Sequence, residues 1–295
     1  DVSGNGSRRL APMLLREVEY ARPSTVEEAV SLLGEHEGAR CLAGGQTLVN
    51  VMKQRAASPD LLVDLRDLRE LRAISVSGST LELGAMATLT AIIGSSEVEV
   101  SRPVLAEVAA TVADVQVRNR GTLGGNVCVN DPTNHFPPLL VALDARMTIR
   151  SGAGERMVSA EEFFIGVYET AVGEGELLTT ISIPARSPSG DAMSGITLGA
   201  HGTYVASAAA SVTEGTWRIA IGCVAGVPVR AARMEQRLED VEPTEDVVRA
   251  AAEGLGTQLD PPSDVHADAE YRRHLSEISA IRAVLQAAQR SKGEE

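Results

Sequence analysis

Two short glycine-rich stretches are the parts of this sequence best suited to bind a ligand. "AGGQT" spans Ala43–Thr47 and "TLGGN" spans Thr122–Asn126. Glycine lets a ligand approach the main chain closely, and successive backbone N–H groups can form a nest that binds an anion. Thr, Gln and Asn add neutral hydrogen-bond donors. The chemistry suits a pyrophosphate group, and two ordinary tight turns are the alternative that these residues leave open.

Several other kinds of site are excluded by what the sequence lacks. There is no GxxxxGK[ST] motif and no GxGxxG after the first predicted strand. No set of His, Asp and Glu has the spacing of metal ligands, so we predict no metal. The chain has three cysteines, at positions 41, 128 and 223. A cysteine-ligated iron–sulfur cluster normally needs four thiolates, so this chain alone is not expected to hold one.

Composition places the chain among globular proteins. It has 295 residues, 44% of them hydrophobic and 23% charged, and a net charge of −13. That charge argues against binding nucleic acid. No apolar run approaches the ~20 residues that span a bilayer, and the widely spaced cysteines fit a reducing compartment. We therefore predict a cytoplasmic protein without a membrane span. Residues 1–12 are expected to be a flexible leader or a remnant of cloning.

The length of 295 residues predicts two domains, or one domain with a distinct appendage, and hydrophobic periodicity predicts both helices and strands along the chain. Ser24 and Glu27 predict a capping box that begins a helix, and the glycine-rich stretch after Val117 is poor material for a helix. Residues 185–195 hold one Pro, two Gly and three Ser and are expected to be the main linker. The remaining expectations are strands at 39–45, 59–65, 176–184, 204–212 and 217–226, a hairpin over 73–89, and helices over 47–55, 102–114, 244–255 and 269–290.

Four motifs in order along the chain resemble one family. "CLAGGQTLVNVMKQR", "QVRNRGTLGGNVCVNDP", "PPLLVALDA" and "FFIGVYETAVGEGELLTTISIP" are similar to the FAD-binding subunit of the molybdenum hydroxylases. Further similarity follows in "IAIGCVAGVPVRAARMEQRL" and "DVHADAEYRRHL". The resemblance covers roughly residues 14–288.

The resemblance implies a fold and a set of cofactor-binding residues. The fold is the two-subdomain FAD-binding domain shared with vanillyl-alcohol oxidase relatives, over 13–185 with subdomains of about 13–70 and 71–185, followed by an α+β C-terminal domain over 192–290. The implied cofactor-binding residues are Arg40, Cys41, Leu42, Ala43, Gly44, Gly45, Gln46, Thr47, Leu48, Thr122, Leu123, Gly124, Gly125, Asn126, Asp131, His135 and Leu178.

The sequence departs from the family's pattern at two places near the implied flavin position. His135 stands where many relatives carry Glu or Asp. The segment "SGITLGAHGTY" lacks the basic residue that many relatives carry there. His135, His201 and Tyr204 are therefore candidate catalytic residues. His135 could contact the flavin or a substrate, or it could satisfy a turn. For His201 and Tyr204 a catalytic or gating role stands against ordinary packing of a loop.

Three hypotheses about function follow. The first is a flavoprotein subunit that takes electrons from a large molybdopterin subunit through a small [2Fe–2S] subunit and passes them to NAD, a quinone or oxygen. The second is a stand-alone FAD-dependent dehydrogenase or oxidase that acts directly on a small molecule. The third is a catalytically silent nucleotide-binding or assembly module. The sequence identifies neither the substrate nor the electron acceptor.

Overall fold

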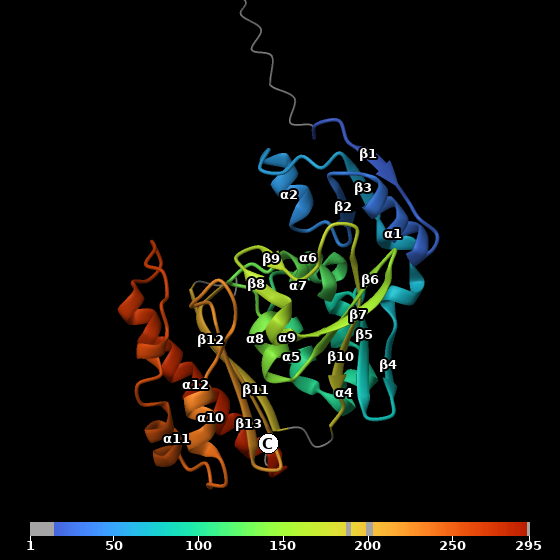
Figure 1. Ribbon diagram of the computed structural model, residues 1–295. Helices are drawn as coiled ribbons and strands as arrows, with labels where there is room; N and C mark the ends of the chain where they lie inside the picture. The colour runs from blue at the N-terminus through green and yellow to red at the C-terminus, as the bar shows by residue number, and fades with distance from the viewer. Residues whose placement is uncertain (1–14, 187–189, 199–202, 294–295) are drawn as a thin grey trace, which may run out of the picture.

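The computed structural model describes residues 15–186, 190–198 and 203–293. These residues form three lobes, each built on its own sheet, which follow one another along the chain (Figure 1). We name them the first lobe (15–72), the second lobe (73–186) and the third lobe (190–293).

The first lobe carries the predicted strand–helix–strand unit. Its parallel sheet has the order β1-β3-β2. The strands and helices are β1 (Glu19–Ala21), α1 (Val26–Glu35), β2 (Ala39–Leu42), α2 (Leu48–Lys53) and β3 (Leu61–Asp64), followed by the short 3₁₀ helices η1 (Leu65–Asp67) and η2 (Arg69–Arg72). Because β2 and β3 run parallel, both strands end at the same edge of the sheet.

The start of α1 corrects the predicted cap by one residue. Thr25, not Ser24, is the N-cap, and its side chain accepts a hydrogen bond from the N–H of Glu28. The carboxylate of Glu28 in turn accepts from the N–H of Ser24 at 2.7 Å. Ser24 and Thr25 both offer a capping hydroxyl, so two starting points for the helix are possible. The helix adopts the one that begins at Val26, which is buried.

The second lobe is an antiparallel sheet covered by short helices. The strand order is β4-β5-β10-β6-β7, and β8 pairs separately with β9. Its strands are β4 (Ile74–Ser77), β5 (Thr80–Gly84), β6 (Arg146–Ser151), β7 (Gly154–Ser159), β8 (Phe164–Gly166), β9 (Glu169–Thr170) and β10 (Leu177–Pro184). Its helices are α3 (Leu89–Ile93), α4 (Ser96–Ser101), α5 (Pro103–Thr111), α6 (Val115–Arg120), α7 (Leu123–Val129), α8 (Phe136–Ala142) and α9 (Ala160–Phe163). The predicted hairpin and the helix beginning at Pro103 are confirmed.

The glycine-rich stretch after Val117 is helical, contrary to the sequence prediction. Helix α6 reaches Arg120, Gly121 interrupts it, and α7 begins at Leu123. Thr122 is the N-cap of α7, and its hydroxyl accepts from the N–H of Gly125. Glycine is a poor helix former, but this cap and tertiary packing outweigh that preference in a helix of only seven residues.

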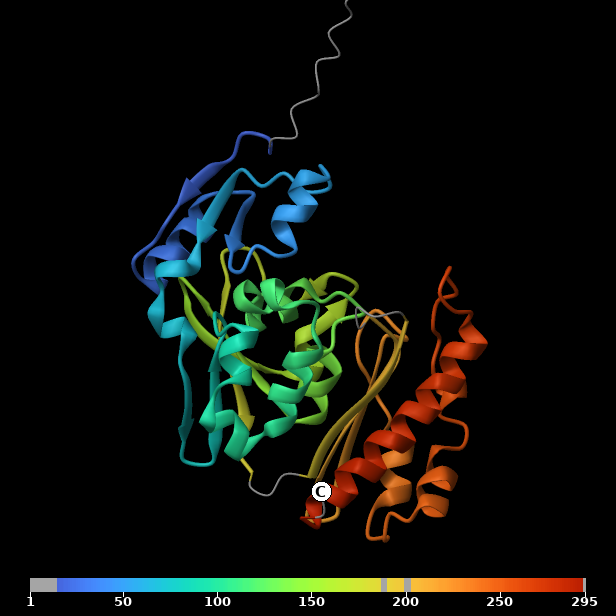
Figure 2. The ribbon, with the colours of Figure 1, turned by 180° about the vertical axis from the view of Figure 1, so that it is seen from behind.

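The third lobe places one antiparallel sheet between helices. Its strand order is β11-β12-β13-β14. The elements are β11 (Gly190–Leu198), β12 (Thr203–Thr213), β13 (Thr216–Gly222), β14 (Val229–Arg230), α10 (Ala232–Leu238), α11 (Glu245–Ala252), η3 (Gly256–Gln258) and α12 (Ala269–Ser291). Helix α12 packs on β11 and β12, and α8 of the second lobe contacts β12 and β13 (Figures 1 and 2). Because β11 begins at Gly190, the second half of the predicted linker is a strand.

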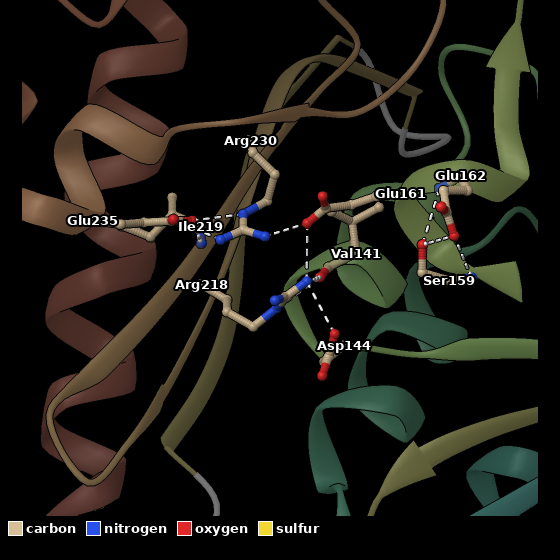
Figure 3. Close-up of polar contacts among 9 residues, drawn as sticks. All are labelled: Val141, Asp144, Ser159, Glu161, Glu162, Arg218, Ile219, Arg230 and Glu235. Carbon is tan, nitrogen blue, oxygen red and sulfur yellow. Dashed lines mark hydrogen bonds and ion pairs between the residues drawn. The ribbon is translucent and has the colours of Figure 1, made fainter.

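Ionic contacts join the third lobe to the second. Arg218 donates to the carbonyl of Val141 and to Glu161, and Glu161 also pairs with Arg230 (Figure 3). Arg230 in turn pairs with the buried carboxylate of Glu235 at 2.6 Å. The hydrogen bonds that Arg230 donates to the carboxylate of Glu235, and then the charge of that carboxylate, raise the pKa of Arg230 despite partial burial. The two lobes are therefore linked by charge as well as by apolar packing.

Candidate functional site

The two glycine loops, which are about eighty residues apart in sequence, touch in the structure. A Cβ added to Gly44 would lie 2.1 Å from the carbonyl oxygen of Arg120 and 2.9 Å from Cα of Gly121. A Cβ on Gly125 would lie 3.8 Å from that of Ala43. The glycine at position 44 therefore lets two main chains meet, and this contact brings the first and second lobes together at the loops.

The first loop presents a run of free backbone donors. No described residue accepts a hydrogen bond from the N–H of Gly44, Gly45, Gln46 or Thr47. Gly45 has a φ of 72°, a conformation that glycine adopts without strain. The side-chain amide of Gln46 donates to the carbonyl of Gly44 at 3.1 Å and so braces the turn. Consecutive unpaired N–H groups in a turn of this kind bind anions.

The second loop uses its donors internally. The N–H groups of Leu123 and Gly124 donate to the carbonyls of Ala87 and Ala85, at 2.9 and 2.8 Å. Those of Gly125 and Asn126 donate to the hydroxyl and the carbonyl of Thr122. A Cβ on Gly124 would lie 2.6 Å from the carbonyl oxygen of Ala85. The glycines of this loop thus serve packing, and the two loops are not chemically equivalent.

One polar atom of the second loop is left over. The side-chain Oδ1 of Asn126 is buried, and no hydrogen bond reaches it from the described residues. The backbone carbonyl of Asn126 is held by the side-chain amide of Asn134 at 2.9 Å. Since an unpaired buried acceptor costs free energy, Oδ1 of Asn126 is an observation that points to a ligand able to donate to it.

The flanking predicted residues divide between the loop and the core. Arg40, Cys41 and Leu42 lie in β2, and Leu48 begins α2, all beside the first loop. Leu123 and Leu178 are buried in the core of the second lobe, at 0% and 3% exposure. Burial raises the pKa of both the Cys41 and the Cys128 thiol to about 12. These thiols are therefore neutral at ordinary pH, which fits packing of Cys128 against the core.

Asp131 lies two residues after the end of α7 and has a partner that the sequence did not indicate. One carboxylate oxygen accepts from the N–H and hydroxyl of Thr133, at 2.9 and 2.7 Å. The other accepts from the hydroxyl of Tyr168 at 3.0 Å. This hydrogen bond raises the pKa of Tyr168. Tyr168 lies between β8 and β9 and is 63% exposed, and its only sequence signal is its place in a motif quoted above.

His135 and Tyr204 meet between the second and third lobes. Their ring centroids are 4.1 Å apart. Nδ1 of buried His135 shares a hydrogen bond of 2.9 Å with the hydroxyl of Thr111. Burial raises the pKa of Tyr204, and a hydrogen bond with Thr111 opposes that shift. Thr111 was not predicted and carries no sequence signal. His201, the third candidate, lies outside the described residues.

Two kinds of site are not found among the described residues. No group of three or more His, Cys, Asp and Glu is arranged to hold a metal ion. No helix in the described ranges is both long and apolar enough to cross a membrane.

Comparison with known proteins gives a consistent family. Residues 16–186 match the FAD binding domain in molybdopterin dehydrogenase, and residues 196–287 match the CO dehydrogenase flavoprotein C-terminal domain. The carbon monoxide dehydrogenase medium chain of Hydrogenophaga pseudoflava is 35% identical over 90% of this chain and 95% of its own. The nicotine 6-hydroxylase medium subunit of Paenarthrobacter nicotinovorans is 32% identical over 95% of this chain and 100% of its own.

A solved structure agrees with the sequence matches. Carbon monoxide dehydrogenase from Hydrogenophaga pseudoflava superposes with a TM-score of 0.90 at 36% identity, covering 94% of this chain and 99% of that one. The two family matches together extend over the three lobes, and the superposition covers them as well. The FAD-binding α+β fold and the α+β C-terminal region inferred from the sequence are thus confirmed, and the chain belongs to the family of FAD-binding medium subunits of the molybdenum hydroxylases.

Proposed function

We propose that this chain binds FAD and, through it, passes electrons to a small-molecule acceptor. The electrons would come from a large molybdenum-containing subunit by way of a small [2Fe–2S] subunit. The observation that carries the proposal is the match to medium chains of multisubunit enzymes over nearly the full length of both sequences. When bound, the flavin accepts electrons and passes them on, and the protein supplies its position and electrostatics.

The free donors of the first loop support a specific placement of the cofactor. The N–H groups of Gly44 to Thr47 would hold the FAD pyrophosphate, because a dianionic group satisfies several neighbouring donors at once. Oδ1 of Asn126 would accept a hydrogen bond from another part of the cofactor. The remaining residues that the resemblance implies, including Asp131 and His135, would contact FAD or position the residues that contact it.

Partner subunits are needed for electrons to reach this flavin. The chain's three cysteines are free, and they are one fewer than the thiolates that a cluster normally needs. Iron–sulfur chemistry therefore has to come from another chain. We further propose that the complex works in the cytoplasm, which is consistent with free thiols. The relatives named above act on different substrates, so we propose that the large subunit determines which substrate is oxidised.

The domain boundaries remain part of the proposal. We place the FAD-binding domain at 13–185, with subdomains meeting near residue 70, and the C-terminal domain at 192–290. The support is that each of the first two sheets lies wholly within one of these subdomains.

The decisive experiment is native purification of the chain alone and of its complex. We expect the isolated chain to bind equimolar FAD that small-molecule substrates do not reduce, and affinity purification from the source cells to recover a large and an iron–sulfur subunit. Direct reduction of the flavin in the isolated chain would replace this proposal with the stand-alone dehydrogenase. A chain that takes up no FAD would exclude both.

A further inference from the structure

A repeat of three residues follows the last strand of the first lobe. Residues 65–72 read "LRDLRELR", so that a leucine is followed by an arginine every third residue. In a 3₁₀ helix, side chains three residues apart lie on the same side. The leucines at 65, 68 and 71 are accordingly buried, and the arginines at 66, 69 and 72 are exposed. The three arginines therefore form a row of guanidinium groups on the surface, and the three leucines beneath them are buried.

These arginines line a recess of about 390 Å³ together with Asp67. Ligand sites in proteins have volumes of roughly 300–1,000 Å³. The carboxylate of Asp67 is already engaged, since both of its oxygens accept from Arg22 at 2.6–3.1 Å. The recess is therefore positively charged, although the chain as a whole has a net charge of −13.

Most of the guanidinium donors in the recess are uncommitted. Arg66 uses its Nε on the buried carboxylate of Asp64, at 2.6 Å. Arg72 donates from one Nη to the backbone carbonyl of Arg66. Arg69 makes no hydrogen bond or ion pair with any described residue. The donors that remain have no acceptor on the described part of the chain.

The position of the recess also fits a ligand site. Asp64, the last residue of β3, pairs in register with Leu42, the last residue of β2. The recess thus begins at the carboxyl edge of the parallel sheet, where ligands of open α/β sheets bind. None of its lining residues belongs to either glycine loop, so this site is separate from the donors proposed to hold FAD.

We propose that Arg66, Arg69 and Arg72 form a second anion site, which binds a small molecule that carries adjacent phosphoryl groups. A guanidinium donates two parallel hydrogen bonds to a phosphate. Arg69 and Arg72 are one 3₁₀ turn apart, about 6 Å, so a diphosphate can reach both while a single carboxylate reaches one. The polar lining favours such a charged ligand over an apolar one.

The test is a calorimetric titration of the FAD-loaded protein with inorganic pyrophosphate. We expect saturable binding that weakens at least about tenfold in Arg69→Gln and is lost in the Arg69→Gln/Arg72→Gln double variant. Inorganic phosphate should bind more weakly than pyrophosphate. Arg233→Gln, which removes an exposed arginine in α10, is the matched control and should bind like the parent protein. Flavin content and thermal unfolding verify that each variant is folded.

Three results would overturn the proposal. The first is absence of pyrophosphate binding, or equal weakening by Arg233→Gln. The second is binding to the FAD-free protein alone, which would assign these arginines to the FAD cradle. The third is unaltered pyrophosphate binding in the double variant combined with poorer recovery of partner subunits, which would make the row a contact for an acidic protein surface. Flavin content is read separately, so failure here is distinct from failure of the proposed FAD subunit function.

Discussion

The two glycine loops differ in what their backbone N–H groups do. Gly44 to Thr47 leave four consecutive donors without an acceptor among the described residues. Leu123 to Asn126 have all theirs bonded to the chain itself. The first loop is therefore the anion-binding half of the site, and the second is the surface against which it is set. The missing Cβ of Gly44 makes this arrangement possible.

Replacing Gly44 with alanine should separate the loops. The new Cβ would meet the main chain of Arg120 at 2.1 Å, so the loops must move apart. Overpacking of this kind costs about 1–3 kcal/mol. We expect lower thermal stability and loss of most bound FAD, measured by calorimetry and flavin absorbance. Gly152→Ala is the control, because its Cβ would have no neighbour within 4 Å. Retention of full FAD by Gly44→Ala would contradict the arrangement.

Asn126 separates cofactor binding from folding. Because its Oδ1 has no partner in the protein alone, Asn126→Ala should leave the free energy of unfolding of the FAD-free chain within about 0.5 kcal/mol of the parent. Its affinity for FAD should fall by about tenfold. Asn134→Ala is the contrasting variant, since it removes a bond to the backbone and should lower FAD-free stability by about 1 kcal/mol. Urea unfolding and FAD titration measure both quantities. Equal losses of FAD-free stability in the two variants would contradict this assignment.

The cysteines make stability depend on alkaline pH. Burial raises the pKa of Cys41, Cys128 and Cys223 to about 12, whereas an unfolded thiol ionises near about 8.5. A pKa raised by folding gives stability that is complete below the unfolded pKa and lost as pH rises toward the folded one. Above about pH 9 each thiol should therefore lower the unfolding free energy by up to about 1.4 kcal/mol per pH unit.

Urea unfolding between pH 8 and pH 10 measures how steeply the unfolding free energy falls with pH. A disulfide reagent applied at pH 8 measures the reactivity of the thiols directly. We expect slow labelling of the native protein and rapid labelling after denaturation. Cys223→Ala should remove one thiol's share of the slope. Native thiols that react as fast as denatured ones would show that the pKa values are not raised.

Among the helices and strands, hydrophobic periodicity identified the ones whose boundaries are set by residues within or next to the element itself. Strands β2 and β3, the β4–β5 hairpin and α12 were predicted because apolar spacing and turn residues are local signals. Short α10 and the two-residue β14 were missed. Helix α7 was predicted wrongly because Gly124 and Gly125 have low helix propensity, and the contacts that compensate come from Ala85 and Ala87, far away in sequence.

The site shows the same limit. The residues of both loops were named from sequence, yet whether their donors are free depends on partners such as Ala87 that no motif marks. The stretch "EVEVSR" at 97–102 has three charged residues in six, a composition typical of a solvated surface, but its Arg102 is 1% exposed. Only the fold reveals its partner, Asp191, which lies 89 positions later. Long-range pairing of this kind has no local signature.

Two of the ionic links between the second and third lobes should differ in strength. Arg102 and Asp191 pair at 2.5 Å with side chains 2% and 0% exposed, whereas Glu161, which pairs with Arg218, is 43% exposed. Removing one partner of a buried pair leaves the other unpaired and costs about 3–5 kcal/mol. An exposed pair contributes about 0–1 kcal/mol. We expect Asp191→Asn to destabilise the protein far more than the matched Glu161→Gln, as measured by urea unfolding. Similar losses would contradict this ranking.

At the scale of the whole molecule, the second and third lobes share a core. Ala209 of β12 and Ala220 of β13 belong to the same buried cluster as Leu139 of α8. The lobes are further fastened by the Arg102–Asp191 pair and by Arg290, which donates to the carbonyl of Asp191 and pairs with Glu107. Separation would expose apolar surface and unpair buried charge together. These two lobes are therefore expected to be one cooperative unit, even though they match two family domains.

Cooperative unfolding of these lobes can be tested by calorimetry and by truncation. We expect the second and third lobes to unfold in one transition, because Arg102 and α8 lose their partners if the third lobe melts alone. A chain ending at residue 186 should then bind a hydrophobic dye and unfold at a lower temperature than the full chain. The full chain carrying Glu161→Gln is the control, since it weakens only the pairs that Arg218 and Arg230 make with this exposed carboxylate. Two resolved transitions in the full chain, with a truncated chain as stable as the first of them, would show that the lobes fold independently.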